Sequence, residues 1–246
     1  SFKFAVENDN KNPLLDVVFD GEHIMDYDIV AHNTTISMTV LDENKFIFVQ
    51  DPAAFDAELT YPDGSKQKLL VSMDEVSFTP ATKAGEKAIL EFAAQDLPTG
   101  EYKLQVSVVD GSGNPSSDLA YEIHFNVIRE ATLTNVYPYP NPFTSSMQFV
   151  FTLTGEAVPD YMKIQIMTVS GKVVREINHT ELGALKIGNN ISEFTWDGTD
   201  QFGDNLANGV YLYKVTAKLN GEDLEHRDSA GDGFFQDGYG KIYIMR

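Results

Sequence analysis

Alternation of apolar and polar residues runs through most of the chain and limits its fold more than any other feature of the sequence. Ile36, Met38 and Val40 share one parity, with Ser37 and Thr39 between them. A period of two residues places successive side chains on opposite faces of a β-strand, whereas a helix needs a period of about 3.6. Helical periodicity is almost absent. The alternation predicts strands at 15–19, 36–40, 46–49, 57–61, 68–72, 87–92, 102–108, 121–127, 147–153, 162–169, 172–177, 191–196, 210–218 and 241–245.

Turn-forming residues separate these segments. Examples are Pro62-Asp63-Gly64, Asn220-Gly221 and the Asp-Gly-Ser-Gly-Asn sequence at 110–114. Glycine and asparagine adopt the backbone conformations that tight turns require. Short strands with frequent turns favour antiparallel sandwiches over a parallel sheet with crossover helices, so we predict an all-β fold.

An internal repeat sets the number of domains. The Leu-x-x-Gly-x-Tyr sequence at 97–102 recurs at 206–211, at a constant offset (206 − 97 = 109). Two earlier landmarks recur in the same order, Gly64 at Gly171 (171 − 64 = 107) and the alternating 36–40 segment at 147–151 (147 − 36 = 111). Landmarks that keep their order, with offsets that drift through loop lengths, indicate tandem copies of one supersecondary plan.

The repeat divides the chain into residues 1–130 and 131–246, and we expect each part to be an immunoglobulin-like antiparallel β-sandwich. In each copy the glycine supplies a positive φ or a close approach just before a strand. The tyrosine that follows places its ring at the core, and its hydroxyl can bond back to the preceding loop. Tyr102 and Tyr211 are therefore expected to be packing residues and not ligand contacts.

Composition excludes several classes of function. Lysine and arginine number 18 against 37 aspartates and glutamates, a net charge of −19, which disfavours nucleic acid or an anionic membrane surface as a partner. The absence of cysteine excludes disulfides, thiolate metal sites and a cysteine nucleophile. We expect no secretory signal in residues 1–7, and the uncharged 131–155 segment is too rich in proline for a membrane-spanning helix.

Six short motifs follow one another in the second half: Tyr139-Pro-Asn-Pro-Phe143, the alternating 147–153 segment, Val169-Ser-Gly-Lys-Val-Val174, Trp196-Asp-Gly-Thr-Asp200, Leu206-Ala-Asn-Gly-Val-Tyr211 and Lys241-Ile-Tyr-Ile-Met-Arg246. This ordered set resembles the C-terminal sorting domains of proteins exported by the type IX secretion system of Bacteroidota. It also resembles the related flagellar-hook-cap-type immunoglobulin-like domain. The resemblance implies an extracellular or outer-membrane-associated protein whose partners belong to the secretion or sorting machinery.

The whole chain also looks like the C-terminal region of very large Bacteroidota surface proteins, among them gingipain-type cysteine peptidases related to the secretion system's sortase. Two features differ from a sorting domain that is cleaved after export. The 126–135 linker has no glycine or proline, and the 228–240 segment is inserted before the last predicted strand. Both features fit a C-terminal module that is retained.

The final segment is the candidate partner-binding site, made of Lys241, Ile242, Tyr243, Ile244, Met245 and Arg246. A terminal edge strand with an exposed row of backbone groups can pair with a strand of a partner. We hypothesise that a transport or sorting receptor binds this end. The alternative is that the strand only closes the second sheet.

No catalytic constellation is recognisable, so we expect no enzyme activity. The five histidines, His23, His32, His124, His179 and His226, stand in five different local contexts. No motif places a serine or aspartate nucleophile beside one of them.

Calcium is the one cofactor that the sequence suggests, because this cation takes several oxygen ligands from acidic turns. The candidate ligands are Asp197, Asp200 and Asp204 in one hairpin-like turn. The resemblance supplies an alternative, in which Trp-Asp-Gly-x-Asp forms a turn whose aspartates cap backbone amides. A second acidic zone near the start contains Glu7, Asp9, Asp16, Asp26 and Asp28.

These features favour a non-catalytic C-terminal region of a secreted or cell-surface bacterial protein, acting in type IX export, sorting or surface attachment through protein contacts. One alternative is a pair of accessory modules that stabilise or position a gingipain-like cysteine peptidase upstream. Another is a carbohydrate or adhesin-ligand module. Such a module needs aromatic platforms, and the single Trp196, expected in a core turn, counts against it.

Overall fold

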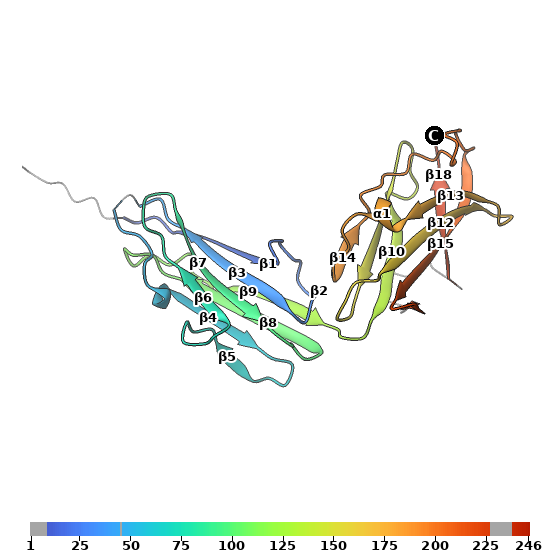
Figure 1. Cartoon of the computed structure of the whole chain (residues 1–246). Coiled ribbons are helices and arrows are strands. Elements are labelled where there is room, and N and C mark those ends of the chain that lie inside the picture. The colour runs from blue at the N-terminus through green and yellow to red at the C-terminus, as the bar shows by residue number, and fades with distance from the viewer. Residues whose placement is uncertain (1–8, 45, 227–237) are drawn as a thin grey trace, which may run out of the picture. The chain divides into compact units, whose positions relative to one another are not determined.

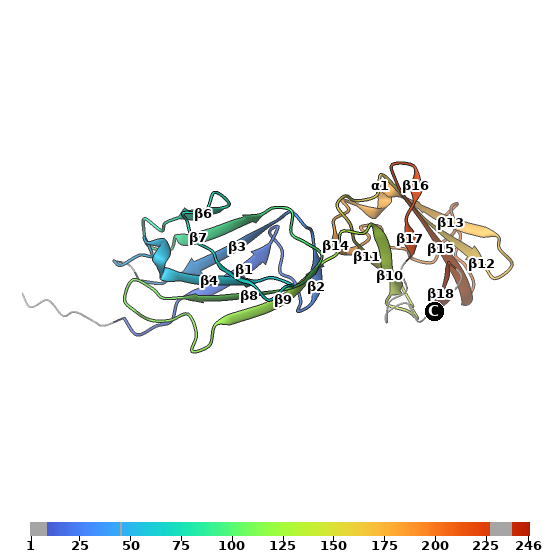
Figure 2. The same ribbon diagram turned by 90° about the horizontal axis from the view of Figure 1, so that it is seen from below.

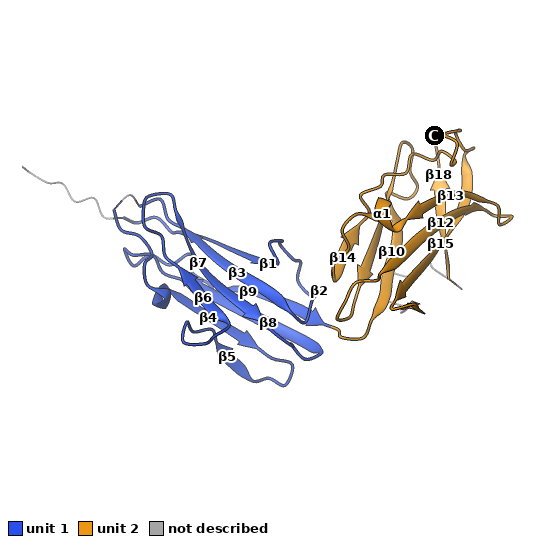
Figure 3. Cartoon of the chain, in the orientation of Figure 1, with its two compact units in different colours: residues 1–127 blue, residues 128–246 orange. Residues whose placement is uncertain are grey.

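The computed structural model describes residues 9–44, 46–226 and 238–246, and the chain divides into two compact units, 1–127 and 128–246 (Figure 3). The predicted boundary at 130/131 lies three residues beyond this division (130 − 127 = 3). The predicted fold class, two tandem immunoglobulin-like antiparallel β-sandwiches, is confirmed. Beside the strands, the described residues hold one 3-10 helix, Pro52–Ala54, and one α-helix, α1, His179–Leu182. No helix in this described part is long and apolar enough to span a membrane.

The first unit consists of two sheets packed around one apolar core (Figures 1 and 2). One sheet has the strand order β1-β3-β7-β6 and the other β2-β9-β8-β4-β5. The β2–β9 pair is parallel, and the other pairs are antiparallel. The strands are β1 Leu14–Phe19, β2 Asp28–Val30, β3 Thr34–Leu41, β4 Phe55–Thr60, β5 Lys66–Lys68, β6 Val76–Thr79, β7 Lys87–Ala94, β8 Gly100–Val108 and β9 Tyr121–Val127.

The second unit repeats this arrangement around its own core. One sheet has the order β14-β11-β10-β17; in the other, β13-β12-β15-β16, the strand β18 also pairs with β15. The strands are β10 Thr132–Tyr139, β11 Gln148–Leu153, β12 Tyr161–Thr168, β13 Val173–Asn178, β14 Gly188–Ile191, β15 Gly209–Leu219, β16 Glu222–Asp223, β17 Glu225–His226 and β18 Tyr239–Ile244. Alternate residues of the long strands are buried, as the sequence alternation requires.

Strand register shows that the sequence repeat is a structural repeat. Ala57 of β4 pairs with Val106 of β8, and Ile164 of β12 pairs with Val215 of β15. The two pairs occupy equivalent positions in the repeat: the first partners are 107 residues apart (164 − 57) and the second partners 109 (215 − 106), which are the offsets found in the sequence. Register decides which side chains enter the core, so the two units bury equivalent positions.

The Leu-x-x-Gly-x-Tyr sequence forms the same corner in both units. The hydroxyl of Tyr102 donates to the carbonyl of Pro98 at 2.8 Å, and that of Tyr211 donates to the carbonyl of Ala207 at 3.0 Å. Both rings are buried. Burial raises the pKa of Tyr102 to about 12. These tyrosines are packing residues, as expected.

Three predicted strands are wrong in whole or in part. Residues 46–49 lie outside the sheets, because the Asn44 side chain accepts the amides of Phe46 and Ile47 and holds them in a loop. The 191–196 prediction keeps only Ile191, since the Ser192 hydroxyl donates to the Phe194 carbonyl and takes the chain out of the ladder. The 68–72 prediction keeps only Lys68, the last residue of β5.

One long strand was missed. Residues 132–139 of the proline-rich segment 132–143, interpreted as an entry segment, form β10 and pair with β11. Pro138 is tolerated there because β17, the neighbour on the other side, pairs only with Thr132 and Leu133. A strand can hold a proline where no partner needs its missing N–H.

Alanine substitutions at the two corner glycines can distinguish the cost of the positive φ from the cost of a steric clash. Gly100 has φ +149° and Gly209 φ +152°, conformations that cost an alanine about 1–3 kcal/mol. A Cβ at Gly100 would also lie 2.5 Å from the Pro62 ring, whereas one at Gly209 would meet nothing within 4 Å. We therefore expect Gly100→Ala to lower the free energy of unfolding of its unit more than Gly209→Ala lowers that of the other.

Urea unfolding measures both losses, because Trp196, the single tryptophan, reports the second unit by fluorescence and far-ultraviolet circular dichroism reports both units. Equal losses from the two substitutions would contradict the steric role assigned to Pro62.

Candidate functional site

Trp196 is the centre of an aromatic cluster in the second unit. Its ring is buried, and its indole N–H donates to the carbonyl of Thr199 at 2.8 Å. The rings of Phe143 and Tyr211 pack against it, with centroids 5.6 Å and 6.4 Å away. Three of the motifs that carry the family resemblance therefore meet here, although they are far apart in the sequence.

The predicted calcium ligands do not converge. Asp197 accepts the amide and hydroxyl of Thr199, at 3.0 and 2.7 Å, and these bonds, led by the hydroxyl, lower the pKa of Asp197. Asp200 accepts the amides of Phe202 and Asp204, at 2.9 and 3.0 Å. Within the described residues, the one set of three acidic groups with ligand oxygens within 4.8 Å of one another lies in the first unit. Asp197 and Asp200 cap backbone amides of the turn, as in the alternative to a calcium site given in the sequence analysis. Calcium at this turn stays a prediction.

The acidic zone predicted near the start also separates. Glu7 lies outside the described residues. Three of the others have different partners: Asp16 lies 2.6 Å from the His23 ring, Asp26 accepts the amide of His124 and Asp28 accepts the amide of Met25. Asp9 instead joins Asp42 and Asp110, two residues that the sequence analysis did not connect with it.

The described histidines occupy separate places. His23 and His124 belong to the first unit, where His124 stacks on Tyr27 with ring centroids 5.0 Å apart. His32 follows β2, and His179 begins α1 of the second unit. The side chain of His226 lies outside the description.

Arg246 fastens the end of the chain to two loops. Its guanidinium donates to the carbonyls of Asp197 and Leu206, and its backbone exchanges two hydrogen bonds of 3.0 Å with the Asn208 side chain. Gly198 lies beside it with φ +77°, a conformation that favours glycine, and a Cβ there would lie 2.7 Å from the guanidinium. The predicted metal turn and the predicted partner strand are therefore one connected structure.

The last strand, β18, is bonded along both edges. Its inner edge pairs with β15. On its outer edge, Phe143 donates its amide to the Tyr243 carbonyl at 3.0 Å and accepts the amide of Met245 at 2.9 Å. The Asn141 side chain accepts the amide of Tyr243 at 2.9 Å and donates to the Lys241 carbonyl at 3.0 Å. The expected exposed row of backbone groups is therefore wrong, because the proline-rich segment covers these positions.

Side chains, and not backbone groups, remain available on β18. Ile242 and Ile244 point into the core and are fully buried. Lys241, Tyr243 and Met245 alternate with them and are exposed. Partner binding by this strand stays a prediction, and it now requires recognition of the outward side chains.

A half-open groove of about 660 Å³ lies beside these side chains, and we call it the Tyr–Pro groove. Most of its surface is apolar. Tyr139 is 67% exposed there, and Tyr137 and Tyr243 are each 37% exposed. Sequence reasoning missed the groove because the proline-rich segment was interpreted only as a connection. Its lining residues are Tyr137, Pro138, Tyr139, Pro140, Asn141, Pro142, Lys241 and Tyr243.

Replacing Asn141 tests how the outer edge of β18 is held. Asn141→Ala removes both side-chain hydrogen bonds to the strand, and the expected loss is about 1–3 kcal/mol in the free energy of unfolding of the second unit. Urea unfolding followed by Trp196 fluorescence measures the loss. Asn205→Ala, at an exposed turn of the same unit, is the matched control. A loss no larger than that of the control would contradict the role of Asn141.

Residues 140–221 match the family described as the FlgD Ig-like domain. The match covers a third of the chain and lies within the second unit, from Pro140 to two residues beyond the end of β15. No curated protein matches the chain.

Three solved structures are similar over nearly the whole chain. Dimeric latent PorU from Porphyromonas gingivalis is 19% identical with a TM-score of 0.36; the similarity covers 96% of this chain and 20% of PorU. The fibronectin(III)-like modules of Clostridium thermocellum CbhA are 12% identical with a TM-score of 0.27, and the similarity covers 93% of this chain and 94% of that one. Chicken CNTN1 FN1-FN3 domains are 11% identical with a TM-score of 0.29, covering 96% and 68%. This chain spans about a fifth of the PorU chain.

Proposed function

We propose that the chain is a non-catalytic pair of immunoglobulin-like modules of a secreted or cell-surface bacterial protein. Its second unit acts in type IX export or surface attachment by contacting a protein of that machinery through the Tyr–Pro groove. The observation that carries the proposal is the composition of this groove. It is built from the proline-rich segment and β18, two of the segments on which the resemblance to sorting domains rests.

The chemistry of the groove suits a protein partner. Tyrosine is enriched at protein interfaces, where its ring contributes apolar area and its hydroxyl a hydrogen bond. Prolines on the groove wall lose little conformational freedom on binding, which lowers the entropic cost of association. The net charge of −19 disfavours a polyanionic partner. Lys241 adds one positive group at the rim for an acidic or carbonyl group of the partner.

A test must leave the fold intact. Deleting residues 241–246 would remove Ile242 and Ile244 from the core, so a loss of export would report unfolding as well as lost recognition. Substitution of outward side chains avoids this difficulty. The informative variant is the double substitution Tyr139→Ser with Tyr243→Ser, made in the natural protein.

The matched control is Tyr161→Ser. Tyr161 is 41% exposed and pairs with Lys218, at the other end of β15 from Val210, which pairs with Tyr243. In a bacterium with type IX secretion, we expect the double variant to lower the exported or surface-attached fraction by at least about tenfold, since central tyrosines dominate interface energies. The control should export normally. Normal export of a double variant whose thermal unfolding is unchanged would refute the groove as the docking site.

A further inference from the structure

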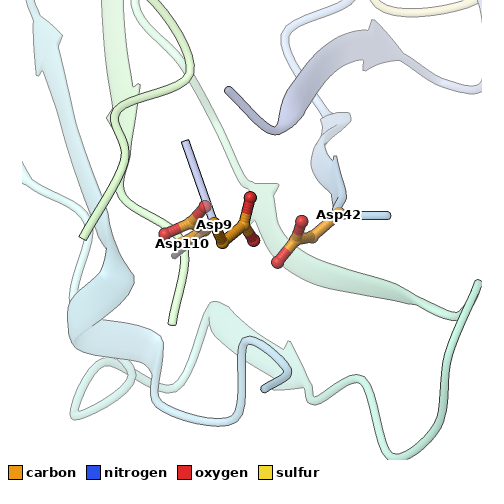
Figure 4. A group of neighbouring side chains, drawn as sticks. All are labelled: Asp9, Asp42 and Asp110. Atoms are coloured by element: carbon orange, nitrogen blue, oxygen red, sulfur yellow. The ribbon is translucent and has the colours of Figure 1, made fainter. Parts of the chain in front are cut away.

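Three aspartates meet at one end of the first unit (Figure 4). Asp9 precedes β1, Asp42 follows β3 directly and Asp110 follows β8. One carboxylate oxygen of each lies within 4.8 Å of the others. The three segments are far apart in the sequence, and no ladder hydrogen bond joins them at these residues, so the fold itself brings the carboxylates together.

Asp42 carries the second observation, a buried oxygen without a partner. The residue is only 8% exposed, and Asp110 is 6% exposed. Oδ1 of Asp42 accepts the amide of Asn44 at 3.1 Å. Its Oδ2 is buried and has no hydrogen-bond partner among the described residues. In Figure 4 the Asp42 carboxylate points toward Asp9. A buried carboxylate oxygen is normally bonded, so this one requires a partner of another kind.

Charge gives the same indication. Asp42 and Asp110 are both buried and Asp9 lies beside them, so three like charges share one partly buried site. The nearby ammonium of Lys11 pairs with Glu43 at 3.2 Å. Within the described residues, no lysine or arginine forms an ion pair with any of the three aspartates. Like charges that lie together in a partly buried site destabilise the fold unless a cation neutralises them.

Amide donors hold two of the three carboxylates in place. The Asn44 side-chain amide donates to Oδ2 of Asp9 at 2.8 Å. The Asn114 side-chain amide donates to the backbone carbonyl of Asp9 at 3.3 Å and to Oδ2 of Asp110 at 2.8 Å. The Ser112 hydroxyl adds an oxygen atom 3.4 Å from Oδ2 of Asp9. The candidate ligand atoms are thus oxygens, without sulfur or imidazole, and such a set selects a hard cation.

We propose that Asp9, Asp42 and Asp110 bind one calcium ion, which fastens the segment ahead of β1 to the ends of β3 and β8. The ion neutralises the three charges and gives the orphaned oxygen of Asp42 its partner. The site lies in the first unit, so it is separate from the Tyr–Pro groove and from the turn at 197–204.

The test uses the full chain, stripped of cations with a chelator. Calorimetric titration with calcium chloride should show saturable binding of one ion per chain. Thermal unfolding of the first unit should shift upward with calcium, because a ligand that binds only the native state stabilises it. Absence of both saturable heat and a thermal shift at calcium concentrations of about 10 mM, well above the range of extracellular calcium modules, would overturn the proposal.

Asp42→Asn gives a result that a merely structural role of Asp42 would not produce. Without calcium, the variant should unfold at the same temperature as the natural chain or higher, because one buried like charge is gone. With calcium, its thermal shift should be lost and its affinity should fall by at least tenfold. This opposite behaviour in chelator and in calcium separates lost binding from lost folding.

Asp204→Asn is the matched control, with the same change of charge at an exposed turn of the second unit. It should bind calcium like the natural chain. Retention of calcium binding by Asp42→Asn would refute the site. Loss of binding in Asp204→Asn alone would also refute it, and would assign the ion to the 197–204 turn.

Discussion

The covering of the last strand on both edges is the constraint on which each sandwich depends. In the second unit, Ile244 of β18 pairs with Gly209 of β15 on one side and with Phe143 on the other. In the first unit, Val127 of β9 pairs with Gly100 and with Val30 of β2 in the same way. In both units the outer partner runs parallel to the last strand and comes from the segment that follows the first strand, β1 or β10. Each sandwich thereby covers its own last strand.

Covering the last strand limits binding there to side-chain contacts, because its backbone groups are already paired. An open edge strand invites pairing with any other strand, so covering it prevents unspecific association. The cover of β18 is short, and its exposed tyrosines and prolines form the Tyr–Pro groove. The segment that protects the backbone thus also presents the side chains proposed for docking. In the first unit the corresponding cover follows Tyr27, whose ring stacks on His124 of β9, and the three aspartates lie in loops of that unit.

The sequence predicted the features that depend on local pattern. Alternation identified most long strands, and the 109-residue offset between the two corners identified a repeat whose pairing register the structure reproduces. The Asp197 and Asp200 amide caps were an alternative derived from the family resemblance. The strand β10 was missed because its prolines conceal a pairing that needs N–H groups on one side only.

Contacts between distant segments could not be predicted. Asn141 and Tyr243 are 102 positions apart, and Ser112 and Asp9 are 103 apart, so no periodicity links them. Asp110 was recognisable as part of a turn, but nothing local distinguishes an aspartate that only caps a turn from one that also faces two other carboxylates. The sequence likewise places Lys241 to Arg246 at an edge without indicating that another segment covers this edge.

Residue-resolved amide hydrogen exchange of Tyr243 and Met245 tests the central claim most directly. Both amides are bonded to the proline-rich segment, so they should exchange as slowly as the amides buried between β12 and β15, through opening of the whole second unit. Exchange at the rate of exposed amides, while the β12–β15 ladder stays protected, would show that the edge is open and would contradict the account.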